Sequence, residues 1–251
     1  MQLREILVFS GLAVATASPL SRRCGPAGIL PDQLQPTPSA VSFTYVLPST
    51  GGPIPLPAAN STLQHIAVGH GVQNYTCSTA GTKAGATGAL AVLYEVTRLY
   101  PRSGPQSLSQ ESWDELTSKV LRTTSQPIGS DSEESASPFP PPEDLTVEGV
   151  RRPIPYLGHH FFDDAGVATF ELRDDQGLFK GAKVMNISAP ATADQGLNDE
   201  GAVDWLYLGD KGSSVGLSKV YRVLTSGGNP AVCGDVGETQ SVPYTAMYWI
   251  Y

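Results

Sequence analysis

Short segments of alternating polar and apolar residues, separated by turn signals, constrain the fold of this chain more than any other feature. Residues 90–97 and 167–173 alternate with a period of two, which is typical of strands with one buried face. Little helical sequence separates such segments, which disfavours parallel strands joined by helices. We therefore predict an all-β fold, mainly an antiparallel β-sandwich or barrel. Further strands are expected at residues 63–68, 72–77, 156–162, 178–187, 203–208, 217–224 and 242–250.

One short helix is predicted at residues 109–122. Trp113, Leu116 and Val120 fall at helical spacing on one side of this segment. Ser112, followed three residues later by a glutamate, resembles a capping box, although the helix can begin a few residues earlier.

Glycine-rich segments are interpreted as turns and loops. Gly69-His70-Gly71 is a turn signal, which makes residues 63–68 and 72–77 two separate strands. Residues 81–88 lack the spacing of a phosphate-binding loop, and a strand rather than a helix follows them. Residues 212–216 match G-x-S-x-G, but a strand follows and no histidine occurs later in the chain. These contexts favour turns, and no cofactor is predicted.

The first residues predict export from the cell. Arg4 precedes an apolar run at residues 6–17, which is too short to span a bilayer. Ala15-Thr16-Ala17 is a small-x-small cleavage site, so residues 1–17 are predicted to be a signal peptide. We therefore expect a secreted, extracellular protein.

Residues 18–60 are predicted to be a proline-rich arm with a candidate processing site after Arg23, and residues 61–251 to be a single β-domain. An insertion at about 125–148 is acidic and has few apolar residues. It cannot bury enough surface to offset its chain entropy, so we predict a long disordered acidic loop. This is the candidate interaction loop, with residues Asp131, Glu133, Glu134, Phe139, Glu143 and Asp144.

The formal net charge of −8 argues against nucleic acid or an anionic membrane as the main partner. After the signal peptide, no stretch approaches the roughly 20 apolar residues of a membrane span. In an oxidising compartment at least two of the three cysteines should pair, and the spacing leaves all three pairings open. The cysteines are Cys24, Cys77 and Cys233, and the glycosylation sequons begin at Asn60, Asn74 and Asn186.

The only candidate metal or acid–base site combines His159 and His160 with Asp163 and Asp164. Neighbouring residues on a strand point to opposite faces, so the two histidines would share a metal only if the strand bends. A polar strand end followed by a turn is the favoured interpretation. Most of the late tyrosines and tryptophans are expected to fill the core, and the alternative is a surface aromatic strip that binds carbohydrate or protein.

Several segments together resemble a family of secreted fungal and bacterial proteins of unknown function, whose fungal members often carry the label "malate dehydrogenase". The resemblance covers residues 55–251. A dehydrogenase of that kind needs a nucleotide-binding βαβ unit, an arginine pair and an Asp-His relay, and none is readable here, so that activity is not expected. The segments are residues 72–77, 158–162, 201–206, 220–230 and 244–251.

The resemblance also bears on the cysteines. Fungal relatives often have an additional cysteine near the position of residues 96–97, and the resemblance implies that it pairs with the one that matches Cys77. Its absence here favours a Cys24–Cys233 disulfide and leaves Cys77 unpaired.

The resulting hypothesis is a non-enzymatic, secreted binding protein, such as a fungal effector or cell-surface protein. It would act by contact with a host or cell-surface protein and could inhibit a papain-like protease. The alternatives are a small secreted enzyme with a His/Asp site and a structural protein of the cell wall.

Overall fold

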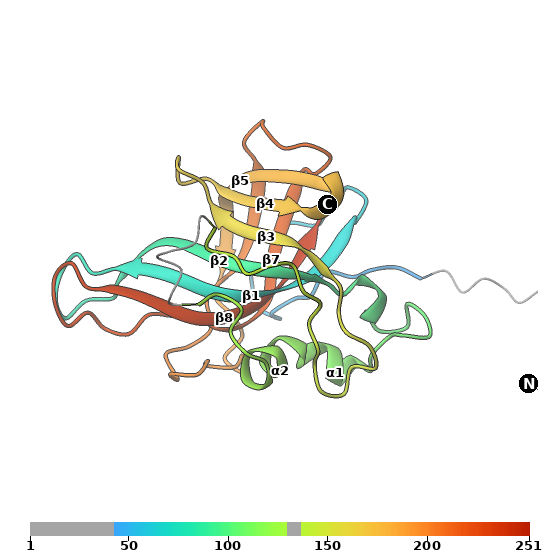
Figure 1. Ribbon diagram of the computed structural model, residues 1–251, viewed down its shortest axis with the longest axis horizontal. Coiled ribbons are helices and arrows are strands. Elements are labelled where there is room, and N and C mark those ends of the chain that lie inside the picture. The colour runs from blue at the N-terminus through green and yellow to red at the C-terminus, as the bar shows by residue number, and fades with distance from the viewer. Residues whose placement is uncertain (1–42, 130–136) are drawn as a thin grey trace, which may run out of the picture. The chain divides into compact units, whose positions relative to one another are not determined.

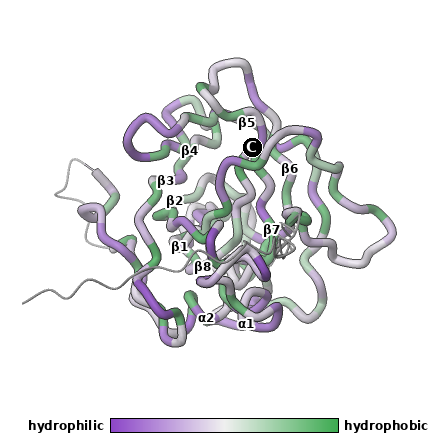
Figure 2. Tube along the Cα trace, turned by 90° about the vertical axis from the view of Figure 1, so that its right-hand side faces the viewer, coloured by the Kyte–Doolittle hydropathy of each residue, from purple (hydrophilic) through white to green (hydrophobic). Residues whose placement is uncertain are grey.

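The computed structural model describes residues 43–129 and 137–251, which form an antiparallel β-barrel with helices on its outside. Each strand pairs with the next, and β1 pairs with β8 to close the barrel. Figures 1 and 2 show the strands following one another around a ring. This confirms the predicted all-β class and selects the barrel over the sandwich. The strands are β1 (His65–Thr76), β2 (Gly85–Glu95), β3 (Tyr156–Phe162), β4 (Ala168–Leu172), β5 (Gly177–Ile187), β6 (Trp205–Asp210), β7 (Lys219–Gly227) and β8 (Thr239–Ile250).

The barrel interior holds one of the two larger apolar clusters, and a small third one surrounds Cys77 and Cys233. Because side chains alternate across a strand, every strand sends one set of residues inward. Phe170 of β4 packs against Phe179 of β5 and Tyr248 of β8, with ring centroids 5.9 and 5.0 Å apart. Leu93, Leu172 and other aliphatic side chains fill the rest of this end of the barrel.

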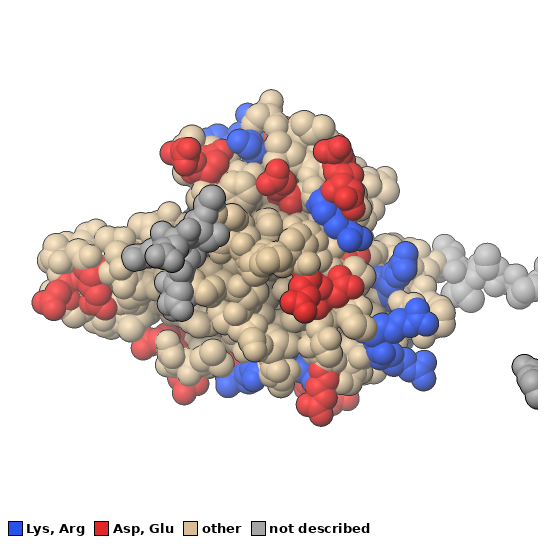
Figure 3. Space-filling model, in the orientation of Figure 1, with Lys and Arg blue, Asp and Glu red and all other residues tan. Residues whose placement is uncertain are grey.

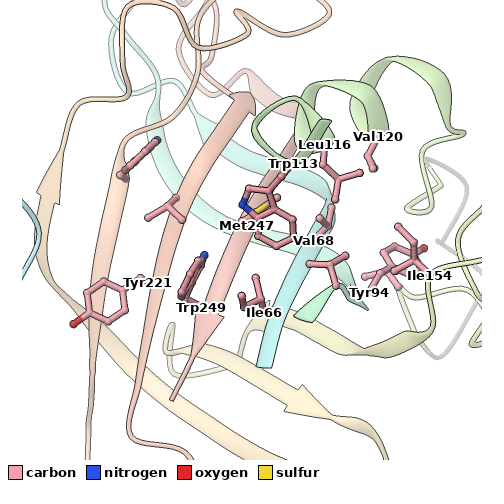
Figure 4. Close-up of a cluster of buried hydrophobic side chains, with 14 of the residues drawn as sticks. Ile66, Val68, Tyr94, Trp113, Leu116, Val120, Ile154, Tyr221, Met247 and Trp249 are labelled. Carbon is pink, nitrogen blue, oxygen red and sulfur yellow. The ribbon is translucent and has the colours of Figure 1, made fainter. Parts of the chain in front are cut away.

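The second cluster lies between the outer face of the barrel and two short helices, α1 (Gln110–Asp114) and α2 (Leu116–Thr123). Figure 4 shows Trp113, Leu116 and Val120 turned toward Met247 and Trp249 of β8, which confirms the predicted apolar side of the helical segment. Burial of each such side chain stabilises the fold by about 1.5–3 kcal/mol.

The helical segment departs from its prediction in two details. Glu115 interrupts it, so that α1 and α2 are separate helices. The first helix is capped by Ser109, whose hydroxyl accepts a hydrogen bond from the Ser112 backbone N–H, so Ser112 is not the cap. In the described residues no helix has the length and apolar character needed to cross a membrane.

The turn predicted at Gly69-His70-Gly71 is wrong, because β1 is one continuous strand of 12 residues. The glycines serve close packing instead. A Cβ atom on Gly71 would lie 1.9 Å from the Leu90 carbonyl oxygen, and one on Gly69 would lie 2.5 Å from the ring of Tyr248. Glycine in a strand interior is typical of such close approach.

We predict that Gly71→Ala severely destabilises the barrel, by about 3 kcal/mol or more, because backbone atoms of β2 must move to admit the methyl group. Gly85→Ala is the matched control, since its Cβ would lie 3.7 Å from the nearest atom, the Thr76 carbonyl oxygen. Urea denaturation measures both variants, and equal free energies of unfolding would contradict the packing argument.

The disulfide joins Cys77 to Cys233, and the predicted Cys24–Cys233 pairing is therefore wrong. The β1–β8 register pairs Thr76 with Thr239, so Cys77 lies beside the segment that leads into β8. The two Cα atoms are 5.6 Å apart, within the normal range for a disulfide. Cys24 lies outside the described residues.

We predict that replacing Cys77 and Cys233 by alanine lowers the free energy of unfolding by roughly 2–5 kcal/mol, because the bond closes a long loop in the unfolded chain. The two single variants should lose about as much as the double variant. Cys24→Ala is the control and should behave as the wild type. Non-reducing peptide mapping that links Cys24 to Cys233 would contradict the pairing.

The acidic insertion is attached to the barrel in the parts that the structure describes. Ile128 and Val147 are buried, while Phe139 and Leu145 pack against the outer cluster. Leu145 also forms a β-bridge with Ile154. The prediction of disorder is therefore wrong for residues 125–129 and 137–148, because a few apolar side chains anchor the insertion to the barrel. Residues 130–136 lie outside the described part.

Candidate ligand-binding site

One end of the barrel is open and holds a cavity of about 620 Å³. It lies at the end where β1 and β3 finish and β2 and β4 begin, so residues from all of these strands line it. An eight-stranded barrel is only just wide enough for its side chains to fill it. Here several lining positions carry small side chains, which leaves space between the larger ones. The small lining residues include Ala86, Gly88, Ala89, Ala168 and Gly181.

The cavity, called the cup below, has Arg222 of β7 as its main buried charge. Its exposed fraction is 9%, and its Nε and Nη2 atoms donate to the Asp204 carbonyl oxygen at 3.1 and 2.9 Å. The Nη1 atom donates to Gln73 Oε1 at 3.4 Å. None of the ion pairs among the described residues includes Arg222.

Gln73 of β1 completes the polar part of the cup. Its Oε1 atom faces Arg222, which leaves the amide nitrogen Nε2 as a donor. This nitrogen lies near the Tyr244 hydroxyl but is buried without a hydrogen-bond partner at bonding geometry. A buried donor without a hydrogen-bond partner thus lies beside a buried positive charge at the base of the cup.

Two tyrosines and a histidine surround this pair. The hydroxyls of Tyr244 and Tyr248 are 2.8 Å apart, and burial raises both pKa values, so both stay neutral. The Nδ1 atom of His160 lies 2.9 Å from the Thr169 carbonyl oxygen. Burial lowers the pKa of His160 to about 4, so the neutral ring donates through Nδ1 and keeps Nε2 as an acceptor.

The rim of the cup is basic. Lys83, Lys183 and Lys211 line it, their side chains are exposed, and none forms an ion pair with a described carboxylate. The carboxylate in the lining is Asp204, whose Oδ2 accepts a hydrogen bond from Asn186 at 2.6 Å. Figure 3 shows acidic and basic side chains mixed on the face it draws. The cup thus concentrates positive charge in a chain of net charge −8.

The structure does not bring the predicted His/Asp site together. His160 faces the barrel interior and stacks on Phe170, whereas His159 stacks on Phe139 outside, with ring centroids 4.1 and 3.8 Å apart. The two candidate aspartates, Asp163 and Asp164, belong to the turn after β3. Asp163 pairs with Lys180 and accepts turn N–H groups, and Asp164 is exposed. No metal-binding cluster forms among the residues the structure describes.

The other predicted positions are scattered over the surface. The side chains of Asn60 and Asn186 are exposed, and Asn74 is half-buried in β1. Within the candidate interaction loop, Glu143 is exposed and Asp144 Oδ1 accepts the Tyr156 N–H at 3.0 Å. Phe139 packs against His159, and three acidic members fall in the undescribed part, namely Asp131, Glu133 and Glu134.

Sequence reasoning missed the polar residues of the cup. Arg222 falls between apolar residues of a strand, in an inward position, and a charge there is a signal of an interior polar site. Gln73 occupies the corresponding inward position on β1, opposite Ala89. The lysines gave no signal, because they belong to separate segments that meet only when the barrel closes.

We predict that acid weakens the fold through its buried histidines. Burial lowers the pKa of His70 and His160 to about 4, whereas the unfolded chain titrates near 6.5. The unfolded state therefore binds more protons, and the free energy of unfolding falls as the pH falls from about 6.5 to about 4, by up to roughly 3 kcal/mol for a fully buried ring.

Urea denaturation between pH 7.5 and 4.5 measures this loss. His160→Leu removes one titrating group and should flatten the dependence, even if the variant is less stable at neutral pH. A variant with the same slope as the wild type would contradict the assignment.

Comparisons with known proteins assign the chain to a family but do not indicate an activity. A family model described as "Protein of unknown function (DUF3455)" matches residues 57–251. No curated protein and no solved structure matches the chain.

Proposed function

We propose that this chain, which belongs to the DUF3455 family of proteins of unknown function, is a binding protein. It would hold a small organic molecule in the open cup of its barrel. The observation that carries this proposal is the cup itself. Its volume of about 620 Å³ falls in the range of small-molecule sites.

The lining of the cup supports recognition of a molecule with both polar and apolar parts. Val203, Leu206 and Leu208 supply apolar surface, and Arg222 with Gln73 supplies a few directed polar groups. This combination is typical of ligand pockets. The polar groups are fixed by backbone and side-chain hydrogen bonds, which suits them to orient a bound molecule.

We also propose that binding takes place outside the cell. The apolar run at residues 6–17 and the cleavage motif that ends it support export, and the Cys77–Cys233 disulfide suits an oxidising compartment. Contact with a host protein, inhibition of a papain-like protease and a role in the cell wall stay predictions of the sequence.

A neutral fluorescent probe, N-phenyl-1-naphthylamine, tests the cup. We predict saturable binding with one site per chain, and a loss of affinity of about tenfold or more, or ~1.4 kcal/mol, in Ala86→Trp, which places a large ring in the mouth.

Val184→Trp is the matched control, because Val184 is 63% exposed on the same end of the barrel and does not line the cup. Its affinity should equal that of the wild type. Equal affinity in all three proteins would remove the cup as the binding site, and so would the absence of saturable binding.

A further inference from the structure

We infer that the ligand of the cup is an organic carboxylate with an apolar body, whose carboxylate binds between Arg222 and Gln73. This inference rests on the proposed function and names its ligand class. It is carried by the polar groups at the base of the cup, the charge of the rim and the apolar walls between them.

The first argument is the unbalanced charge of Arg222. Its side chain is 91% buried, since 9% is exposed, and its described hydrogen bonds go to a backbone carbonyl and an amide oxygen. Both acceptors are neutral. A buried cation without a counter-ion is destabilising, and an anion of the correct geometry would remove that penalty. Asp204 supplies its backbone carbonyl to Arg222, while its carboxylate accepts from Asn186.

The second argument is the direction of the free hydrogen bond. Gln73 directs Oε1 toward Arg222, so the unpartnered atom is the donor Nε2. The Arg222 guanidinium and the Gln73 amide both donate hydrogen bonds. Side by side, they suit a ligand that has two adjacent acceptor atoms. A carboxylate has two such acceptor oxygens, and charge-assisted bonds to them are the strong ones. An alcohol or an amine offers a poorer match to this pair.

The rim supports the same sign of charge. Lys83, Lys183 and Lys211 surround the mouth, and each lacks a described carboxylate partner. A cleft lined by one sign of charge raises the local concentration of the oppositely charged ligand. Because the chain as a whole is acidic, this basic rim would select anions that the rest of the surface repels.

The walls decide against a small inorganic anion. Phe162 is 41% exposed at the mouth, and Val203, Leu206 and Leu208 line the side of the cup. An inorganic phosphate at Arg222 would leave these surfaces in water, whereas an alkyl or aryl body would cover them. The site therefore fits a carboxylate whose apolar body extends from Arg222 toward Phe162.

The test compares decyl compounds that share one chain and differ in the head group. At pH 8, calorimetry with decanoate, decan-1-ol and decyltrimethylammonium should give the tightest binding for decanoate. Its affinity should exceed that of decan-1-ol by about 10- to 100-fold, which is the effect of charge-assisted hydrogen bonds. Inorganic phosphate should compete only weakly with decanoate.

Variants then assign the effect to residues. Arg222→Gln should abolish most of the preference for decanoate over decan-1-ol, and retained binding of decan-1-ol shows that this variant is folded. The double variant Lys183→Gln/Lys211→Gln, at exposed positions, should bind decanoate several-fold more weakly and depend less on salt. Lys119→Gln on α2 is the control outside the cup and should match the wild type.

The outcomes separate the two proposals. Equal affinity for decanoate and decan-1-ol, or a preference for the cation, overturns the carboxylate inference and leaves the binding function in place. If inorganic phosphate binds as tightly as decanoate, the claim that the ligand has an apolar body is wrong. No binding of any decyl compound, together with no effect of Ala86→Trp on the neutral probe, overturns the binding function itself.

Discussion

The pairing of β1 with β8 is the interaction on which the rest of the structure depends. It runs without interruption from His65 opposite Ile250 to Thr76 opposite Thr239, and it turns a row of strands into a closed ring. Closure removes both sheet edges and creates an interior. The glycines of β1 make this possible on a crowded strand, because β1 has a paired neighbour on each side and Tyr248 crosses above Gly69. The disulfide at Cys77 fixes the same seam beyond the barrel.

The closed ring also explains how an acidic chain acquires a basic cup. Arg222 and Gln73 are 149 positions apart in the sequence, yet they meet because their strands flank β8 on either side. Each points inward because side chains alternate between the two faces of a strand. Large aromatic residues such as Phe170 and Phe179 fill the closed end. Stability from the packed end, together with the outer cluster under the helices, offsets the uncompensated charge at the open end. In this arrangement one end of the barrel is packed and the other end is open.

The sequence predicted the strands well where each could be recognised from its own residues. β3 through β8 lie close to their predicted ranges, because alternation and flanking turn residues are local signals. It failed at β1, where glycines that permit close approach look the same as glycines that permit a turn. It failed again at the cysteines and at the attached acidic segment, because both depend on which distant residues the barrel brings near. The cup could not be predicted from the sequence for the same reason, because its lining residues come from many separate segments.

The position of His160 shows how far local chemistry depends on this global closure. The sequence pairs it with His159 and two aspartates, but the strand separates the histidines to opposite faces. Burial then keeps the His160 ring neutral with Nδ1 bound to a backbone carbonyl. His160 thus lines the cup together with Arg222 and Gln73, in the neutral form. A histidine that looked catalytic in the sequence is therefore a neutral, packed part of the cup wall, because its chemistry is set by the strands that close around it.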